Sequence, residues 1–169
     1  ASDAGQVYAI DSGGHQLWVS ADPGEVDSAF ATAPQALGDV MTMPMYFAGG
    51  QNGWYALAPA DGHTLWHVAA TGTRGAGVSS PVVSPDGTTV FGVDSGGLAV
   101  ALDAMSGTER WHANFPAGGG NTPALLGDTL YAIFSDGHLR AINAHDGSMR
   151  WDRDVHVTLF NLSGELPTP

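Results

Sequence analysis

One sequence motif occurs four times along the chain and constrains its fold more than any other feature. Each copy is an apolar run, a short glycine-containing turn and a second run that ends in tryptophan, as in LAVALDAMSGTERW from Leu98 to Trp111. The other three copies end at Trp18, Trp66 and Trp151, so the four tryptophans are 48, 45 and 40 residues apart. Self-similarity at such a period indicates a repeat architecture, in which each unit completes its packing against the next.

The units between these tryptophans read as β-structure. Short β-branched and aromatic runs alternate with Asp-Gly or Ser-Gly pairs, which is the pattern of β-hairpins, and no segment shows a sustained helical period. We expect an all-β protein, a β-propeller of four-stranded antiparallel blades with about three complete blades plus partial terminal blades. Within a single domain, 1–169, the predicted units are a partial blade at 5–21, blades at 34–70, 78–114 and 121–155, and the start of a further blade or a closing strand at 156–169.

Small and large residues recur at fixed places in the motif. The central runs at 98–102 and 129–134 are nearly continuously apolar, as expected of strands covered on both faces. An alanine precedes each tryptophan by ten residues, or by nine in the first copy, and would allow two sheets to approach closely, while the tryptophan supplies a large packing area. We therefore predict that blade docking depends on Ala9, Ala56, Ala101, Ala141, Trp18, Trp66, Trp111 and Trp151.

The pattern Ala-Leu/Ile-Asp/Asn-Ala-x-x-Gly-x-x-x-Trp, with a Ser/Thr-Pro pair opening units at Ser80-Pro81 and Thr122-Pro123, resembles the PQQ-type (quinoprotein-like) β-propeller repeat. That repeat occurs in quinoprotein dehydrogenases, in the periplasmic propeller lipoprotein of the outer-membrane assembly machinery and in extracellular sensor domains. The resemblance covers about residues 5–155 and implies a ring of about seven or eight blades. It also implies that each tryptophan docks its blade on the next, with turn glycines at Gly62, Gly107 and Gly147.

One position of the motif varies among the copies. Asp11, Asp103 and Asn143 fit the acidic or amide position of the family, whereas Ala58 departs from it. The resemblance therefore predicts weaker docking at the second copy.

Composition narrows the class of partner. The chain has 17 acidic residues against five arginines, no lysine and a formal charge of −12, so it repels phosphate backbones and is not expected to bind nucleic acid. No run approaches the roughly 18 apolar residues of a transmembrane segment. There is no cysteine, which excludes disulfides and thiolate sites. The scarcity of basic residues suits a periplasmic or extracellular setting, and the leaderless start ASDAGQ suits a mature chain after signal cleavage.

The resemblance to quinoproteins raises the hypothesis of PQQ held beside calcium by acidic and amide side chains. The aspartates that can be placed fall in turns, strand ends or tails, and alternation directs Arg110 and Arg150 away from the face that the tryptophans use. We therefore predict no catalytic, cofactor-binding or metal-binding residue. Whether the chain is an enzyme stays open, with the balance of the sequence against it.

Seven histidines suggest a metal site at first sight. His67 and His112 follow tryptophans, and His15 and His63 lie near turns, so each pair occupies equivalent places on different blades. Such places are farther apart than ligand bonds of ~2 Å can bridge, which favours exposed polar positions. His138 and His145 flank one hairpin and can pair, but no third ligand is evident.

Three functional hypotheses follow from these patterns. The leading one is a non-catalytic, extracytoplasmic binding or scaffold module that contacts a protein partner through the connectors 22–33, 42–51, 71–79 and 116–122. The alternatives are a fragment of a PQQ-dependent dehydrogenase and a self-assembling structural subunit. The chain holds about half of a propeller, so it is a fragment, a half completed by a second copy, or a small ring closed by 157–162.

Overall fold

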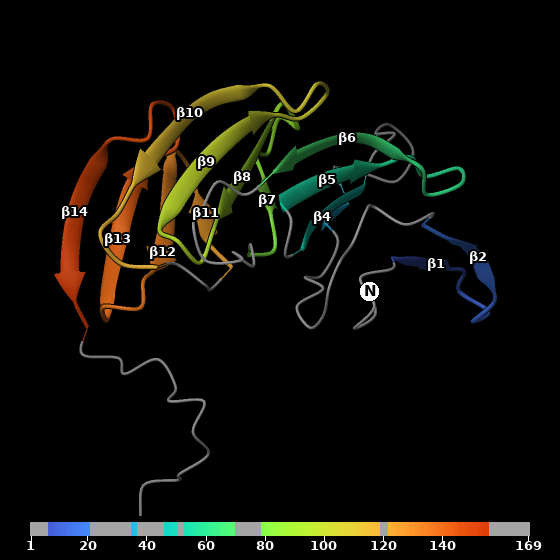
Figure 1. Ribbon diagram of the computed structural model, residues 1–169, viewed down its shortest axis with the longest axis horizontal. Helices are drawn as coiled ribbons and strands as arrows, with labels where there is room; N and C mark the ends of the chain where they lie inside the picture. Colours follow the sequence, from blue (N-terminus) through green and yellow to red (C-terminus); the bar gives the residue numbers. More distant parts are fainter. Residues whose placement is uncertain are drawn as a thin grey trace, which may run out of the picture.

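The computed structural model describes residues 7–20, 35–36, 46–50, 53–69, 79–118 and 122–155, with 35–36 and 46–50 described by their backbone alone. All of the regular secondary structure in these residues is β-strand, which confirms the predicted all-β class. The sheets follow one another along an arc, from β1 and β2 at one end to β11–β14 at the other (Figure 1). No helix in the described ranges has the length and apolar character of a membrane span.

The strands form one two-stranded and three four-stranded antiparallel sheets, each in simple sequence order. The hairpin consists of β1 (Tyr8–Ile10) and β2 (Gln16–Val19). The first four-stranded blade consists of β3 (Gln35–Ala36), β4 (Tyr46–Gly50), β5 (Gly53–Leu57) and β6 (Thr64–Ala69). The next consists of β7 (Val82–Val83), β8 (Thr89–Val93), β9 (Leu98–Asp103) and β10 (Glu109–Asn114). The last consists of β11 (Ala124–Leu126), β12 (Thr129–Ile133), β13 (His138–Asn143) and β14 (Met149–Asp154).

The predicted further blade or closing strand at 156–169 lies outside the described residues. So do the connectors at 22–33 and, apart from Ser79, 71–79. Within the predicted connector 42–51, the backbone at 46–50 forms strand β4, because it pairs with β5.

The last two strands of every unit share one irregularity. Each tryptophan lies directly opposite the alanine of its own motif, and a register shift interrupts the pairing beside this pair. A bulge adds a residue on one strand and increases its twist. The alanine leaves room over the sheet for the large indole, and three of the four indoles, those of Trp18, Trp66 and Trp111, pack in a cluster with the following sheet.

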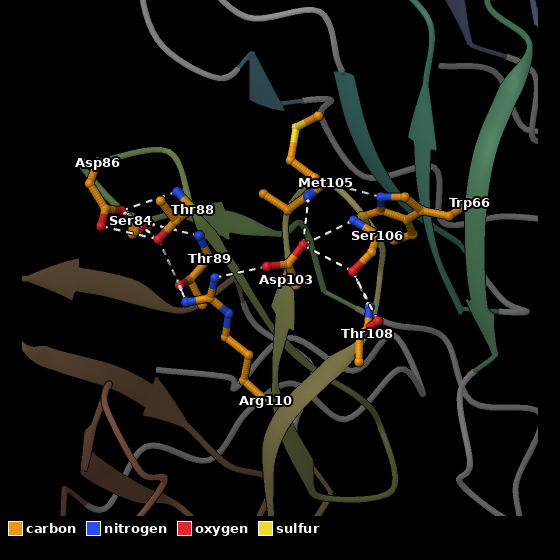
Figure 2. Close-up of polar contacts among 11 residues, drawn as sticks. Trp66, Ser84, Asp86, Thr88, Thr89, Asp103, Met105, Ser106, Thr108 and Arg110 are labelled. Atoms are coloured by element: carbon orange, nitrogen blue, oxygen red, sulfur yellow. Dashed lines mark hydrogen bonds and ion pairs between the residues drawn. The ribbon is translucent and has the colours of Figure 1, made fainter.

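The turns after these alanines are built on side-chain caps. Asp103 Oδ1 accepts hydrogen bonds from the backbone N–H groups of Met105 and Ser106 (Figure 2), which folds the chain back as an Asx turn does. The turn closes through Gly107 at a φ of 69°, a left-handed conformation that glycine adopts at little cost.

Three apolar clusters make up the core, and each lies between two neighbouring sheets. Val7, Tyr55 and Leu57, with Trp18 against them, join hairpin β1–β2 to blade β3–β6. A second cluster around Trp54 and Val90 joins blades β3–β6 and β7–β10. A third cluster, with members such as Phe91, Trp111 and Leu130, joins blades β7–β10 and β11–β14. Burial is thus provided by the stacking of one blade on the next, as in other repeat architectures.

Candidate functional site

The first feature of interest is the contact that three of the four outer-strand tryptophans make with the following blade. Its indole N–H donates to a backbone carbonyl in the turn before that blade's last strand. The three pairs are Trp18 with Pro59 at 2.7 Å, Trp66 with Ala104 at 3.0 Å, and Trp111 with Ala144 at 2.9 Å. Each bond spans two sheets and satisfies a polar atom within an apolar contact, which fixes the orientation of the ring.

A glycine of each receiving turn lies directly against the indole. A Cβ added to these glycines would lie 2.4 Å from Trp18 at Gly62, 2.8 Å from Trp66 at Gly107, and 2.6 Å from Trp111 at Gly147. All three glycines also have positive φ. Any other residue would therefore be strained twice, by its backbone and by the ring above it. Figure 2 shows the Trp66 indole beside the turn that carries Asp103, Met105 and Ser106.

The two ends of the repeat series differ from these three junctions. Trp151 is 39% exposed, whereas Trp111 is 9% exposed. The ring of Trp151 is tilted against that of Tyr131, with a distance of 5.9 Å between the ring centroids. At the other end, Gly14 occupies the turn of hairpin β1–β2 with a φ of 84°, and no described atom lies within 4 Å of where its Cβ would be. The structure thus joins three of the four predicted tryptophans to a following turn.

The turn that begins at Ala58 is capped by a different residue, because Ala58 replaces the acidic or amide residue of the other copies. Asp11 and Asn143 cap their turns as Asp103 does, by accepting backbone N–H groups two residues further on. In the second turn, Asp61 Oδ1 accepts the N–H of His63 instead. Trp18 still bonds to Pro59 there, so the turn that lacks the acid nevertheless receives an indole.

A second feature, which sequence reasoning missed, is a buried arginine on β13. Arg140 is 3% exposed and bonds two carboxylates: Nη2 donates to Asp136 Oδ2 at 2.6 Å and Nε to Asp152 Oδ2 at 3.0 Å. Its guanidinium carbon lies 4.7 Å from the ring centroid of Phe134 and 5.6 Å from that of Phe115, which belongs to the neighbouring unit. Two charge-assisted bonds and two aromatic faces satisfy a cation removed from water.

The Arg140 cluster, consisting of Arg140, Asp136, Asp152 and His138, carries a consistent set of pKa shifts. The bond from Arg140 lowers the pKa of Asp136. His138 Nδ1 contacts Asp152 Oδ1, which lowers the pKa of Asp152 and raises the pKa of His138. These contacts favour the charged form of each group, so the cluster ties β13 to β14 and to Phe115, and has the properties of a structural clamp.

A third feature is Asp94, a fully buried carboxylate at the end of β8. Its Oδ1 accepts the N–H groups of Gly96 and Leu98 at 2.9 and 2.8 Å, while its Oδ2 has no hydrogen-bond partner among the described residues. In sequence it was indistinguishable from a turn aspartate, because Ser95 and Gly96 follow it. Its burial comes from the fold rather than from its neighbours in the chain.

The remaining candidates from the sequence lie apart from these features. Arg110 bonds Asp103 at 2.9 Å and Arg150 bonds Asp128 at 2.6 Å, each inside its own blade. The histidines have separate local contacts: His15 with Asp11, His63 with Asp61, His112 with Glu109 and His67 with the ring of Tyr55. The part of the chain that the structure describes contains no group of three or more His, Asp or Glu residues arranged for a metal ion.

His138 and His145 were predicted to be able to pair. The structure places the imidazole of His138 against Asp152 on the adjacent strand. The backbone N–H of His145 bonds Asn143 in the exposed turn at the end of β13. The two histidines thus have separate carboxylate and amide partners.

Comparisons with known proteins agree with this repeat geometry. The family model described as outer membrane protein assembly factor BamB matches residues 1–85 and 51–165. The fold is similar to the crystal structure of BamB from Moraxella catarrhalis, with a TM-score of 0.68 and 22% sequence identity, over 92% of this chain and 45% of that chain. This chain therefore spans less than half the length of that solved protein. No curated protein sequence matches the chain. The chain belongs to the BamB family, with the PQQ-type β-propeller repeat that its sequence predicts.

Proposed function

We propose that the chain is a non-catalytic binding or scaffold module that works outside the cytoplasm in the assembly of outer-membrane proteins. The observation that carries the proposal is the family match over residues 1–85 and 51–165. A fold shared with BamB supports it, and the propeller scaffold by itself hosts many functions, so the role is assigned through the family.

The blade junctions suit a scaffold. Each junction combines an apolar cluster with an indole-to-carbonyl hydrogen bond, as Trp111 with Ala144 shows. Contacts of this kind hold neighbouring sheets at a fixed angle, and a fixed angle presents the turns of successive blades as one continuous surface. A preorganised surface loses little conformational entropy when a partner binds.

One edge of the arc presents exposed carboxylates to a partner. The two tight turns of a blade lie side by side there, since Ala104 N donates to Thr88 O at 3.0 Å and Ala144 N donates to Asp128 O at 2.9 Å. The exposed acids on these turns, named here the acidic edge, are Asp61, Asp86, Asp128 and Asp146. We place the contact with a protein partner on the acidic edge, because only Asp128 among its four carboxylates is paired with an arginine, and a surface of net negative charge favours a partner of the opposite sign.

The test measures outer-membrane β-barrel proteins in cells that produce this protein, in cells that lack it, and in cells that produce a variant. The variant carries Asp61→Asn, Asp86→Asn and Asp146→Asn, which remove charge and keep a side chain that can cap the turn. The control carries Asp154→Asn at the end of β14, away from the acidic edge. We expect lower β-barrel levels in cells without the protein and with the triple variant, and normal levels with the control.

Unchanged β-barrel levels in cells that lack the protein would refute the assembly role. The non-catalytic part is tested separately by titrating the purified chain with PQQ and calcium while absorbance is recorded. We expect no saturable change, and saturable binding would instead support the quinoprotein alternative.

A further inference from the structure

We infer that a buried water molecule bridges Trp54 and Asp94 at the junction between blades β3–β6 and β7–β10. This water site goes beyond the proposed binding role and does not depend on it. It rests on two buried polar atoms, a donor from one blade and an acceptor from the next, that have no hydrogen-bond partner among the described residues.

The donor is the indole N–H of Trp54, the second residue of β5. Trp54 is 1% exposed and lies in the apolar cluster between the two blades. The described atom nearest to a Cβ added at Gly92 of β8 would be Nε1 of Trp54, at 2.3 Å. The N–H edge of the indole therefore lies over β8, where no described atom accepts its hydrogen bond.

The acceptor is Oδ2 of Asp94, which directly follows β8. Successive side chains of a strand point to opposite faces of the sheet. Val90 belongs to the cluster that contains Trp54, whereas Phe91 and Val93 belong to the cluster on the other side of the blade. Asp94 follows Val90 by four residues, so the alternation directs its carboxylate toward blade β3–β6.

The spacing of the two side chains suits one intervening water. Asp94 continues the pairing of β8, since its backbone N–H donates to the Leu98 carbonyl at 2.8 Å. Residues that share a face of a strand are about 6.6 Å apart along it, so Asp94 stands about that far from Gly92, which lies beneath the Trp54 ring. The structure contains no direct bond between the two polar atoms. A bridging water joins such atoms through two hydrogen bonds of about 2.8 Å each, across a gap that is too long for one bond.

The chemistry of the two groups selects water over an ion. An indole N–H only donates hydrogen bonds and a carboxylate only accepts them. A group between them must accept one bond and donate another, which water does and a metal cation does not. Oδ1 of Asp94 already accepts the N–H groups of Gly96 and Leu98, so Oδ2 is the atom left for the water. Trp54 and Asp94 are at most 1% exposed, and buried polar groups of this kind are satisfied by internal water.

The next blade junction shows that the two polar groups occur together. There the residue at the place of Trp54 is Ala99, and the residue at the place of Asp94 is Phe134. Both belong to the apolar cluster between blades β7–β10 and β11–β14. That junction has neither the donor nor the acceptor at these places, as expected if the pair at the other junction serves one shared water.

The first test detects the water directly by NMR in the 169-residue chain. Magnetisation transfer from water to the indole protons is recorded in NOE and ROE modes, which separate dipolar contact from exchange. We expect a contact with a long-lived water at Hε1 of Trp54, and Trp54→Phe assigns this signal by removing it. Trp66 and Trp111 are internal controls, because their indoles donate directly to the carbonyls of Ala104 and Ala144 and should give no such contact.

A double-mutant cycle tests whether the two groups share one partner. Trp54→Phe removes the donor, Asp94→Leu removes the acceptor, and each single variant leaves the other group poorly satisfied, whereas the double variant leaves neither. The unfolding equilibrium constant in urea should therefore rise about tenfold less in the double variant than the product of the two single effects. The lost turn cap of Asp94→Leu cancels in the cycle. Trp111→Phe is the control and should combine with Asp94→Leu independently, because Trp111 lies on the other face of the blade.

A long-lived water at Trp54, together with coupling to Asp94, would support the inference. Coupling without the water contact would mean a direct bond between the indole and the carboxylate, and would overturn it. Independent effects of the two variants would overturn it as well. If Asp94→Leu does not fold by circular dichroism, Asp94→Asn replaces it in the cycle, because its amide keeps an oxygen for the two backbone N–H groups and presents a donor in place of Oδ2.

Discussion

The two faces of blade β11–β14 have almost the same construction and very different environments. The face toward β7–β10 is fully covered: Leu130, Phe134 and Ile142 have no exposed surface. The opposite face carries the same kind of alanine–tryptophan pair, yet Trp151 is 39% exposed. The difference teaches that the motif prepares a tryptophan for docking, while the turn of the next blade provides its burial and its hydrogen-bond acceptor.

The largest expected effect on stability comes from removing the docked tryptophan, compared with removing the exposed one. Trp111→Ala removes a ring packed in the cluster between two blades and leaves the Ala144 carbonyl without its donor. We expect it to lower the free energy of unfolding by about 4 kcal/mol in urea titrations. Trp151→Ala should cost about 1 kcal/mol, since this ring is 39% exposed to water. Equal losses for the two variants would show that docking contributes nothing.

The receiving side of the junction gives the next largest effect. Gly147→Ala places a Cβ 2.6 Å from the Trp111 ring on a backbone with a φ of 75°, so strain and collision add. We expect a loss of about 3 kcal/mol by thermal or urea unfolding. Gly127→Ala is the matched control, because Gly127 has a positive φ and no described atom lies within 4 Å of the added Cβ, and it should cost about 1 kcal/mol. If both glycine variants lose the same stability, the indole does not constrain the turn.

The sequence predicted the parts of the molecule that repeat. Tryptophan spacing and the Asp-Gly turns indicated the blades, because a repeated contact needs a repeated residue at each copy. It did not predict the Arg140 cluster, since Arg140 occupies the motif place that Val100 has in the preceding blade. Its partners, Phe115 and Phe134, come from different units, and no periodic pattern encodes them. The sequence did not single out Asp94 either. Its place at the end of β8 corresponds to that of Phe134 at the end of β12, so the repeat itself does not indicate a buried acid there.

Replacing Arg140 with valine, the residue at the equivalent place in blade β7–β10, measures how much the arginine contributes to stability. Arg140→Val leaves Asp136 and Asp152 without their buried donor, and both carboxylates are about 30% exposed, so water restores part of the loss. We expect a decrease of about 2 kcal/mol in the free energy of unfolding, below that of a fully buried pair. Arg150→Val, which removes an exposed arginine from Asp128, is the control and should have a much smaller effect. If Arg140→Val left the free energy of unfolding unchanged or raised it, an apolar residue at this place, such as Val100 in blade β7–β10, would stabilise the fold equally well.

The smallest expected effect is a pH dependence in the same cluster. Asp152 raises the pKa of His138 above its ordinary 6.5, so the stability from this contact is fully present below that value and is lost as the pH rises through the higher folded pKa. The pKa of Asp152 is lowered from 3.8 by the same bond, so its contribution is lost only as the pH falls through that lower pKa. His138→Gln should therefore lower the urea midpoint most at about pH 5 to 6 and progressively less above about pH 7. His145→Gln, in the exposed turn that follows β13, is the control. A midpoint difference that stays constant across this range would contradict the prediction, because it would mean that folding leaves the pKa of His138 unchanged, with the opposing effects of Asp136 and Arg140 included.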